Sequence, residues 1–245
     1  MTTEFAEIMA LKGDTYQWEA IEITTSDNYI LTLHHVWNTE TRVKSMGPVL
    51  FQHGNGGSSE SWVKGNETIA MKLADRGHDI YLGNARGNKY SRAHVDYDPW
   101  EDEEQFWDYS FENLADDGYA NVEYMFGDNG HKGWYFGTSQ GTASMQVALS
   151  KYDEYMGDWL NRVILTAPCI YLNIGQGDED SPDPDISESG AEDATWLRDI
   201  GIWVTNGENW DRDIDTICEK MPSKCNWAKN SKGDPKPTKE TEHLK

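Results

Sequence analysis

Apolar and polar residues alternate along the first regular stretch of the chain. Residues 19–36, EAIEITTSDNYILTLHHV, carry apolar side chains at alternate positions on both sides of Ser26-Asp27-Asn28. Such alternation is typical of half-buried strands, and Ser, Asp and Asn favour a turn between them. The pattern therefore predicts an antiparallel hairpin.

After residue 47 the pattern changes to short apolar runs that alternate with longer amphipathic stretches. The apolar runs predict strands at 48–54, 78–84, 132–137 and 161–168. The amphipathic stretches predict helices at 67–77, which ends at Gly77, and at 111–127 and 140–152. A repeated strand–helix–strand order is typical of the α/β class, with a mostly parallel sheet and helices on both faces.

Beyond Pro168 the chain becomes polar. Residues 175–193, GQGDEDSPDPDISESGAED, are acidic and almost free of large apolar side chains, which predicts a surface loop. Residues 195–218 regain a helical periodicity, and residues 228–245 lose it again. We therefore predict a core at 1–169, followed at 170–245 by an insertion over the sheet and a polar tail.

Composition narrows the function classes. With 37% hydrophobic residues and 11 Trp, 12 Tyr and 6 Phe, the chain is predicted to be a packed globular protein. Its 43 acidic and 21 basic residues give a net charge of -22, which excludes binding to a nucleic-acid backbone. The stretch MTTEFAEIMALKG lacks the basic region and apolar core of a signal peptide, and no apolar run is long enough to span a bilayer.

One motif points to nucleophilic catalysis. Gly137-Thr138-Ser139-Gln140-Gly141 matches G-x-S-x-G, in which a serine lies at a sharp turn between a strand and a helix. The predicted strand at 132–137 and helix at 140–152 supply that context. Ser139 is therefore the candidate nucleophile, and a plain glycine turn is the alternative.

An oxyanion hole is the second requirement of such a site. Backbone N–H groups stabilise the negative oxygen of the tetrahedral intermediate. Gln140, directly after the candidate nucleophile, would supply one donor, and Asn55 in the glycine-rich segment LFQHGNGGSS would supply the other. The alternative for this segment is an ordinary turn between a strand and a helix.

Several longer blocks carry a family resemblance. In order and spacing, YILTLHHV, GPVLFQHG, SSESWV, LADRGHDIYLGNARGNKYSRAHV, FWDYSF and GTSQGT resemble the acid lipases, the gastric and lysosomal lipase family, closely over residues 5–170 and loosely to Cys225. The resemblance implies an α/β-hydrolase fold with a helical cap. It also implies hydrolysis of water-insoluble lipid esters, such as triacylglycerols or sterol esters, at a lipid surface.

Carried over to this chain, the resemblance makes Ser139 the nucleophile and Asn55 and Gln140 the oxyanion donors. Relatives usually have an apolar residue at the position of Asn55, a difference that a backbone donor tolerates. The resemblance assigns an architectural role at the sheet's edge, with substrate contact as the alternative, to Arg86, Trp107 and Asp108. We expect no cofactor and no metal. The acidic run at 178–185 lacks the glycine and terminal glutamate of a calcium loop, so we interpret it as a solvated lid face.

The redox state of the three cysteines indicates the cellular compartment in which the protein is found. The spacing of Cys218 and Cys225 by itself leaves open a disulfide or two thiols, whereas the resemblance implies a disulfide in the cap and leaves Cys169 unpaired. Such a disulfide requires an oxidising compartment, so the expected location is extracellular or lysosomal. Asn66 begins the sequon Asn66-Glu67-Thr68, a glycosylation site in a secreted protein.

The partners of Ser139 are the missing part of this prediction. In α/β-hydrolases the acid and then the histidine follow the serine in the chain, and of the seven histidines only His243 does so. The resemblance places both partners beyond the cap. We therefore expect a truncated chain that is inactive alone. One alternative is a compact triad in which Asp211 and His243 are the partners of Ser139. The other is an inactive lipase-like module that binds lipid or joins a protein partner that completes the fold.

Overall fold

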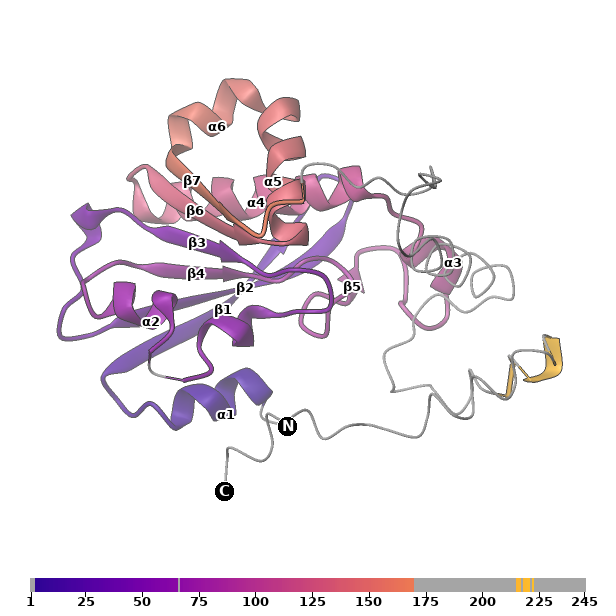
Figure 1. Ribbon diagram of the computed structural model, residues 1–245. Coiled ribbons are helices and arrows are strands. Elements are labelled where there is room, and N and C mark those ends of the chain that lie inside the picture. The colour runs from indigo at the N-terminus through magenta and orange to yellow at the C-terminus, as the bar shows by residue number, and fades with distance from the viewer. Residues whose placement is uncertain (1–2, 66, 170–214, 217, 221, 223–245) are drawn as a thin grey trace, which may run out of the picture. The chain divides into compact units, whose positions relative to one another are not determined.

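The structure is a computed structural model that describes residues 3–65, 67–169, 215–216, 218–220 and 222. The chain divides into two units, Met1–Tyr171 and Leu172–Lys245, and the account below concerns the first of them (Figure 1). Most of the expected lid and tail at 170–245, including the acidic run at 178–185, lies outside the described residues. The boundary between core and insertion therefore stays a proposal.

A single mixed sheet forms the centre of the first unit. Its strands are β1 (Tyr16–Thr24), β2 (Tyr29–Asn38), β3 (Val49–Gln52), β4 (Ile80–Gly83), β5 (Ala93–His94), β6 (Gly133–Thr138) and β7 (Leu160–Thr166). Within the described residues the order is β1-β2-β4-β3-β6-β7, and β5 pairs with β2. Strands β4, β3, β6 and β7 are parallel neighbours, whereas β2 pairs with β1, β4 and β5 in antiparallel fashion.

Helices cover both faces of the sheet (Figure 1). They are α1 (Glu4–Ala10), α2 (Ile69–Ala74), α3 (Glu103–Phe106), α4 (Phe111–Asn129), α5 (Gln140–Lys151) and α6 (Asp153–Trp159), with 3-10 turns η1 (Lys44–Met46) and η2 (Ser59–Trp62). One core cluster joins α4, α5 and α6 to the sheet, and a second joins α1, α2 and η2 to it. Within the part of the chain that the structure describes, none of the helices combines the length and the hydropathy that a membrane span requires.

The predicted hairpin is confirmed as β1 and β2. Its turn is held locally, because Thr25 accepts a side-chain hydrogen bond from the Tyr29 N–H at 3.0 Å and donates one to Asp27 Oδ1 at 2.6 Å. Asn28 adopts a φ of 71°, a left-handed conformation that Asn tolerates better than most residues. The turn residues therefore set the register of the two strands.

The strands and helices predicted between residues 47 and 168 are also confirmed, as β3, β4, β6, β7, α2, α4 and α5. The helical stretch predicted at 195–218 lies mostly outside the described residues. Three short helices escaped prediction: α1, α3 and α6. Helix α1 buries Phe5 and Met9, and the side chain of Thr3 accepts a hydrogen bond from Ala6 N–H at its start. A seven-residue helix has little periodicity of its own, so its stability comes mainly from the apolar surface that it buries.

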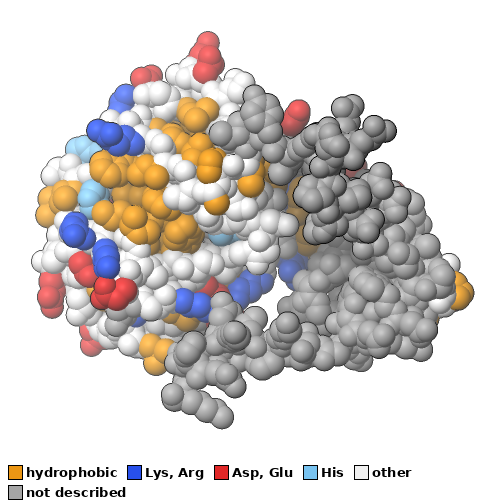
Figure 2. Space-filling model, in the orientation of Figure 1, with side chains coloured by type: hydrophobic (Ala, Val, Ile, Leu, Met, Phe, Trp, Pro, Cys, Tyr) orange, Lys and Arg blue, Asp and Glu red, His pale blue; other side chains and the backbone are white. Residues whose placement is uncertain are grey.

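Apolar side chains also remain at the surface. Those with large exposed areas among the described residues are Leu11, Val43, Met46, Ile69, Val95, Tyr97, Trp100, Phe111 and Tyr155. Figure 2 shows a face on which apolar side chains gather beside lysine and arginine.

The buried ring of His34 predicts loss of stability in acid. His34 stacks on Phe5 with ring centroids 3.8 Å apart, and its Nδ1 lies 2.8 Å from Ser59 Oγ. Burial lowers the pKa of His34 to about 4 from its ordinary value of 6.5. Because the unfolded chain binds this proton first, the His34 contribution is full above pH 6.5 and is lost as the pH falls toward 4.

We expect the free energy of unfolding to fall by about 3 kcal/mol across that window because of His34. Urea unfolding of the wild type and of His34→Asn, measured at several pH values, checks this. The variant lacks the titrating ring and should show a slope smaller by up to about 1.4 kcal/mol per pH unit. If the free energy of unfolding of His34→Asn depended on pH as strongly as that of the wild type, His34 would not be the cause of the loss of stability in acid.

Candidate active site

Ser139 lies at the predicted elbow. It follows the last residue of β6 and caps the N-terminus of α5, with φ 49° and ψ -119°. A positive φ is uncommon and strained for a residue that carries a Cβ. The backbone N–H of Ser139 donates to Thr166 O on the neighbouring strand β7 at 3.1 Å. The turn therefore presents the serine at the carboxyl ends of two parallel strands, where ligands bind in open α/β sheets.

The glycines of the motif are required by close packing. A Cβ at Gly137 would come within 2.8 Å of Gly141 O, and a Cβ at Gly141 within 2.8 Å of the carbonyl oxygens of Gln52 and His53. Neither backbone neighbour can yield without moving a strand or helix. The motif at 137–141 is thus explained by the shape of the elbow.

The glycine-rich loop after β3 lies beside Ser139. A Cβ at Gly54 would lie 2.9 Å from Ser139 Cβ and 3.5 Å from Ser139 Oγ, so only a glycine fits here. The next residue, Asn55, has an exposed side chain. The loop chosen for the second oxyanion donor is therefore in contact with the candidate nucleophile. That the N–H groups of Asn55 and Gln140 face the Ser139 hydroxyl stays a prediction.

Sequence reasoning missed a thiol next to the serine. Cys169 Sγ lies 3.9 Å from Ser139 Oγ in a weak hydrogen bond. The backbone N–H of Cys169 donates to Thr142 Oγ1 at 3.0 Å, and that hydroxyl donates to Ser139 O at 2.6 Å. Cys169 is a free cysteine, as predicted. The parallel pairing of β6 and β7 creates this contact across 30 residues of sequence.

No described histidine is placed to take the proton of Ser139. His53 directly precedes Gly54, which packs against Ser139, but both of its ring nitrogens already have partners. Nδ1 lies 2.7 Å from Gly54 O, and Nε2 accepts a hydrogen bond from the N–H of Ala85 at 3.1 Å. Burial lowers the pKa of His53. The two residues proposed for a compact triad, Asp211 and His243, lie outside the described residues, as does Asn66.

Arg86 has the architectural role that the sequence suggested. Its side chain is fully buried, donates through Nε to Asp117 Oδ1 at 2.8 Å, and forms an ion pair with Asp27 at 2.6 Å. The guanidinium also stacks over the ring of Tyr29, 4.1 Å from its centroid. Burial raises the pKa of Asp117 to about 6, and the charge of Arg86 opposes that rise.

The other two residues of that prediction lie in the following segment. Trp107 donates from its indole nitrogen to Pro99 O at 3.2 Å and packs its ring against Gly87. Among the described residues, the carboxylates that pair with Arg86 are Asp27 and Asp117, and Asp108 is not one of them. Asp27 and Asp117 were missed because they lie 59 and 31 residues from Arg86.

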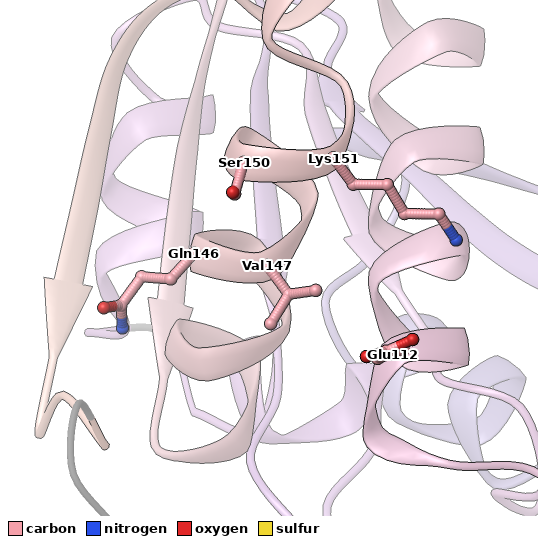
Figure 3. Close-up of a pocket in the computed structure, with 5 residues that line it drawn as sticks. All are labelled: Glu112, Gln146, Val147, Ser150 and Lys151. Atoms are coloured by element: carbon pink, nitrogen blue, oxygen red, sulfur yellow. The ribbon is translucent and has the colours of Figure 1, made fainter.

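A shallow pocket lies between α4 and α5. It has a volume of about 500 Å³ and is lined by Glu112, Gln146, Val147, Ser150 and Lys151 (Figure 3). None of these residues belongs to the predicted site. Its lysine forms an ion pair with Asp116 at 2.6 Å and is thereby held at the edge of the pocket.

The sequence matches two family models. Residues 47–189 match the model described as "alpha/beta hydrolase fold", and residues 6–66 match "Partial alpha/beta-hydrolase lipase region". These matches confirm the resemblance to lipases that the motif blocks indicated.

The proteins to which this chain is similar include two lipases and one esterase of known structure. Lipase 1 of Drosophila melanogaster is 38% identical over 160 residues, which are 64% of this chain and 35% of that protein. Gastric triacylglycerol lipase of Rattus norvegicus is 36% identical over 142 residues, covering 55% of this chain and 35% of that protein. A solved esterase of Pyrococcus furiosus superposes with a TM-score of 0.48 at 16% identity, covering 71% of this chain and 58% of that one. This chain spans little more than a third of the two lipases.

Proposed function

Because the chain belongs to the alpha/beta hydrolase fold family, we propose that it acts in the hydrolysis of lipid esters with Ser139 as the nucleophile. The observation that carries this proposal is the strained turn at Ser139 beside a glycine loop that leaves room at its hydroxyl. Lipid esters are the proposed substrate class, because the similar proteins are named as lipases, one of them a triacylglycerol lipase.

The reaction proceeds by acyl transfer. Ser139 Oγ attacks the ester carbonyl carbon while a base accepts its proton, and the N–H groups of Asn55 and Gln140 stabilise the oxyanion. Gln140 is the first residue of α5, so its N–H lies at the positive end of a twelve-residue helix. The alcohol then leaves with a proton, and water hydrolyses the acyl-enzyme. The base and its carboxylate partner come from residues outside the described ones.

A fluorophosphonate probe tests the nucleophile directly. In the protein expressed from its complete gene, an activated Ser139 should bond covalently to the probe. Trypsin cleaves after Lys132 and Lys151, so the label would be found by mass spectrometry on residues 133–151. Ser139→Ala is the control and should remain unlabelled. Absence of label in the wild type would favour an inactive, lipid-binding module.

Residues 1–245 made alone are expected to show essentially no turnover of a short-chain chromogenic ester. No described base reaches Ser139, and an oxyanion hole without a base retains only a small part of the rate. The assay compares this polypeptide with Ser139→Ala and His243→Ala. Robust turnover that both substitutions abolish would contradict the expectation and establish a compact triad that uses His243.

A disulfide between Cys218 and Cys225 belongs to the same proposal. The resemblance to lipases and the short spacing of these two cysteines support it, and Cys169 is free. Such a bond would place the protein in an oxidising compartment, extracellular or lysosomal, where the sequon at Asn66 would be used. Peptide mass spectrometry without reduction decides whether this pair exists.

A further inference from the structure

The ring of His53 lies buried behind the loop that contacts Ser139. It follows directly after β3 and is 4% exposed. Its Nδ1 lies 2.7 Å from Gly54 O, and its Nε2 lies 3.1 Å from the backbone nitrogen of Ala85. A Cβ at Gly57 would come within 3.1 Å of His53 Cβ, so the loop folds closely over the ring. The ring therefore contacts the loop without reaching the serine.

The partners of the ring determine its tautomer. A backbone N–H can only donate, so Nε2 must accept the hydrogen bond from Ala85. The side-chain amide of Asn88 lies 3.1 Å from the same nitrogen and can serve as a second donor. Burial lowers the pKa of His53 and keeps the ring neutral. The proton of the neutral ring is then on Nδ1, which donates it to Gly54 O.

This hydrogen bond fixes the direction of one peptide group. In a trans peptide the C=O of one residue and the N–H of the next point in opposite directions, and the described residues contain no cis peptide bond. The N–H of Gly57 also donates to Gly54 O, at 3.1 Å, and holds the carbonyl on the side of the ring. The N–H of Asn55 consequently points away from His53, in a loop whose Gly54 packs against Ser139.

We propose that His53 is a positioning residue that holds the Gly54 carbonyl and thereby aims the Asn55 N–H at the oxyanion formed on Ser139. This role rests on the proposed function, because it needs an acyl-transfer reaction at that serine. The ring also joins the loop after β3 to the loop after β4 through Ala85. Its contribution is therefore to the orientation of a donor, and it does not transfer a proton.

Two substitutions separate the two hydrogen bonds of the ring. His53→Asn places an amide N–H near the position of Nδ1 and keeps a donor for Gly54 O. His53→Gln places its amide near the position of Nε2 and loses that donor. In the protein expressed from its complete gene, His53→Gln should lower kcat and the rate of Ser139 phosphonylation on the order of 10- to 100-fold, because one oxyanion donor is misaligned. KM should change by less than about twofold, and His53→Asn should recover most of the rate.

The tautomer gives a readout that needs no activity. Nitrogen chemical shifts of His53 in residues 1–245 should show a protonated Nδ1 and an unprotonated Nε2, and the opposite tautomer would overturn the proposal. Equal labelling rates in the wild type and both variants would also overturn it while leaving the nucleophile established. Failure of the wild type to label at Ser139 would refute the proposed function, and the role of His53 with it.

Discussion

Replacing Ser139 by glycine is expected to abolish activity and at the same time to stabilise the fold. Ser139 adopts φ 49° and ψ -119°, where a residue with a Cβ is strained by about 1–3 kcal/mol. Glycine adopts this conformation without strain. Its greater backbone freedom also stabilises the unfolded chain by about 0.5–1 kcal/mol, which offsets part of the gain. The expected net gain is therefore about 1 kcal/mol. In the protein expressed from its complete gene, loss of the hydroxyl should lower the kcat of ester hydrolysis on the order of 10⁴- to 10⁶-fold.

Ser139→Ala is the matched control for that result. It removes the same hydroxyl but keeps the Cβ and its strain, so its stability should stay close to that of the wild type. Urea unfolding of residues 1–245 in the three forms measures the difference. If the glycine variant were no more stable than the alanine variant, the elbow would not store strain at this residue.

Arg86→Ala is expected to cause the largest loss of stability. The guanidinium is fully buried between Asp117 and Asp27, and its removal leaves Asp117 buried without its countercharge. Breaking a buried ion pair from one side costs about 3–5 kcal/mol. The free energy of unfolding of residues 1–245 in urea should fall by that amount. The double variant Arg86→Met, Asp117→Leu removes both charges and should recover part of the loss.

Comparison of the double variant with Arg86→Ala distinguishes the effect of the uncompensated charge of Asp117 from the effect of lost packing. If the double variant were as unstable as Arg86→Ala, lost packing would explain the effect and the buried charge of Asp117 would not. Asp117 also matters for the site, because its Oδ2 accepts a hydrogen bond at 2.8 Å from the backbone N–H of residue 86, directly after Ala85. We expect loss of this anchor to loosen the loop that supports the ring of His53.

Local patterns in the sequence are sufficient to predict several elements of the fold. The hairpin follows from alternation on both sides of residues 26–28, and the parallel strands follow from short apolar runs between amphipathic stretches. The elbow at Ser139 could also be predicted, because the backbone conformation of a tight turn demands glycines at fixed offsets. In each case the determining residues lie within a few positions of one another.

Contacts between side chains that are distant in the sequence become visible only in the folded chain. Cys169 reaches Ser139 because β7 runs parallel to β6, and His53 reaches Ala85 because β3 and β4 end at the same edge of the sheet. Arg86 pairs with Asp117 because the fold buries both side chains at the same place. The composition of the chain, with its many acidic residues, does not indicate which of them is the partner. Helices α1 and α6 likewise depend on the apolar surface that the sheet offers them. These contacts arise from chain topology, which brings together residues tens of positions apart, and no local pattern records that distance.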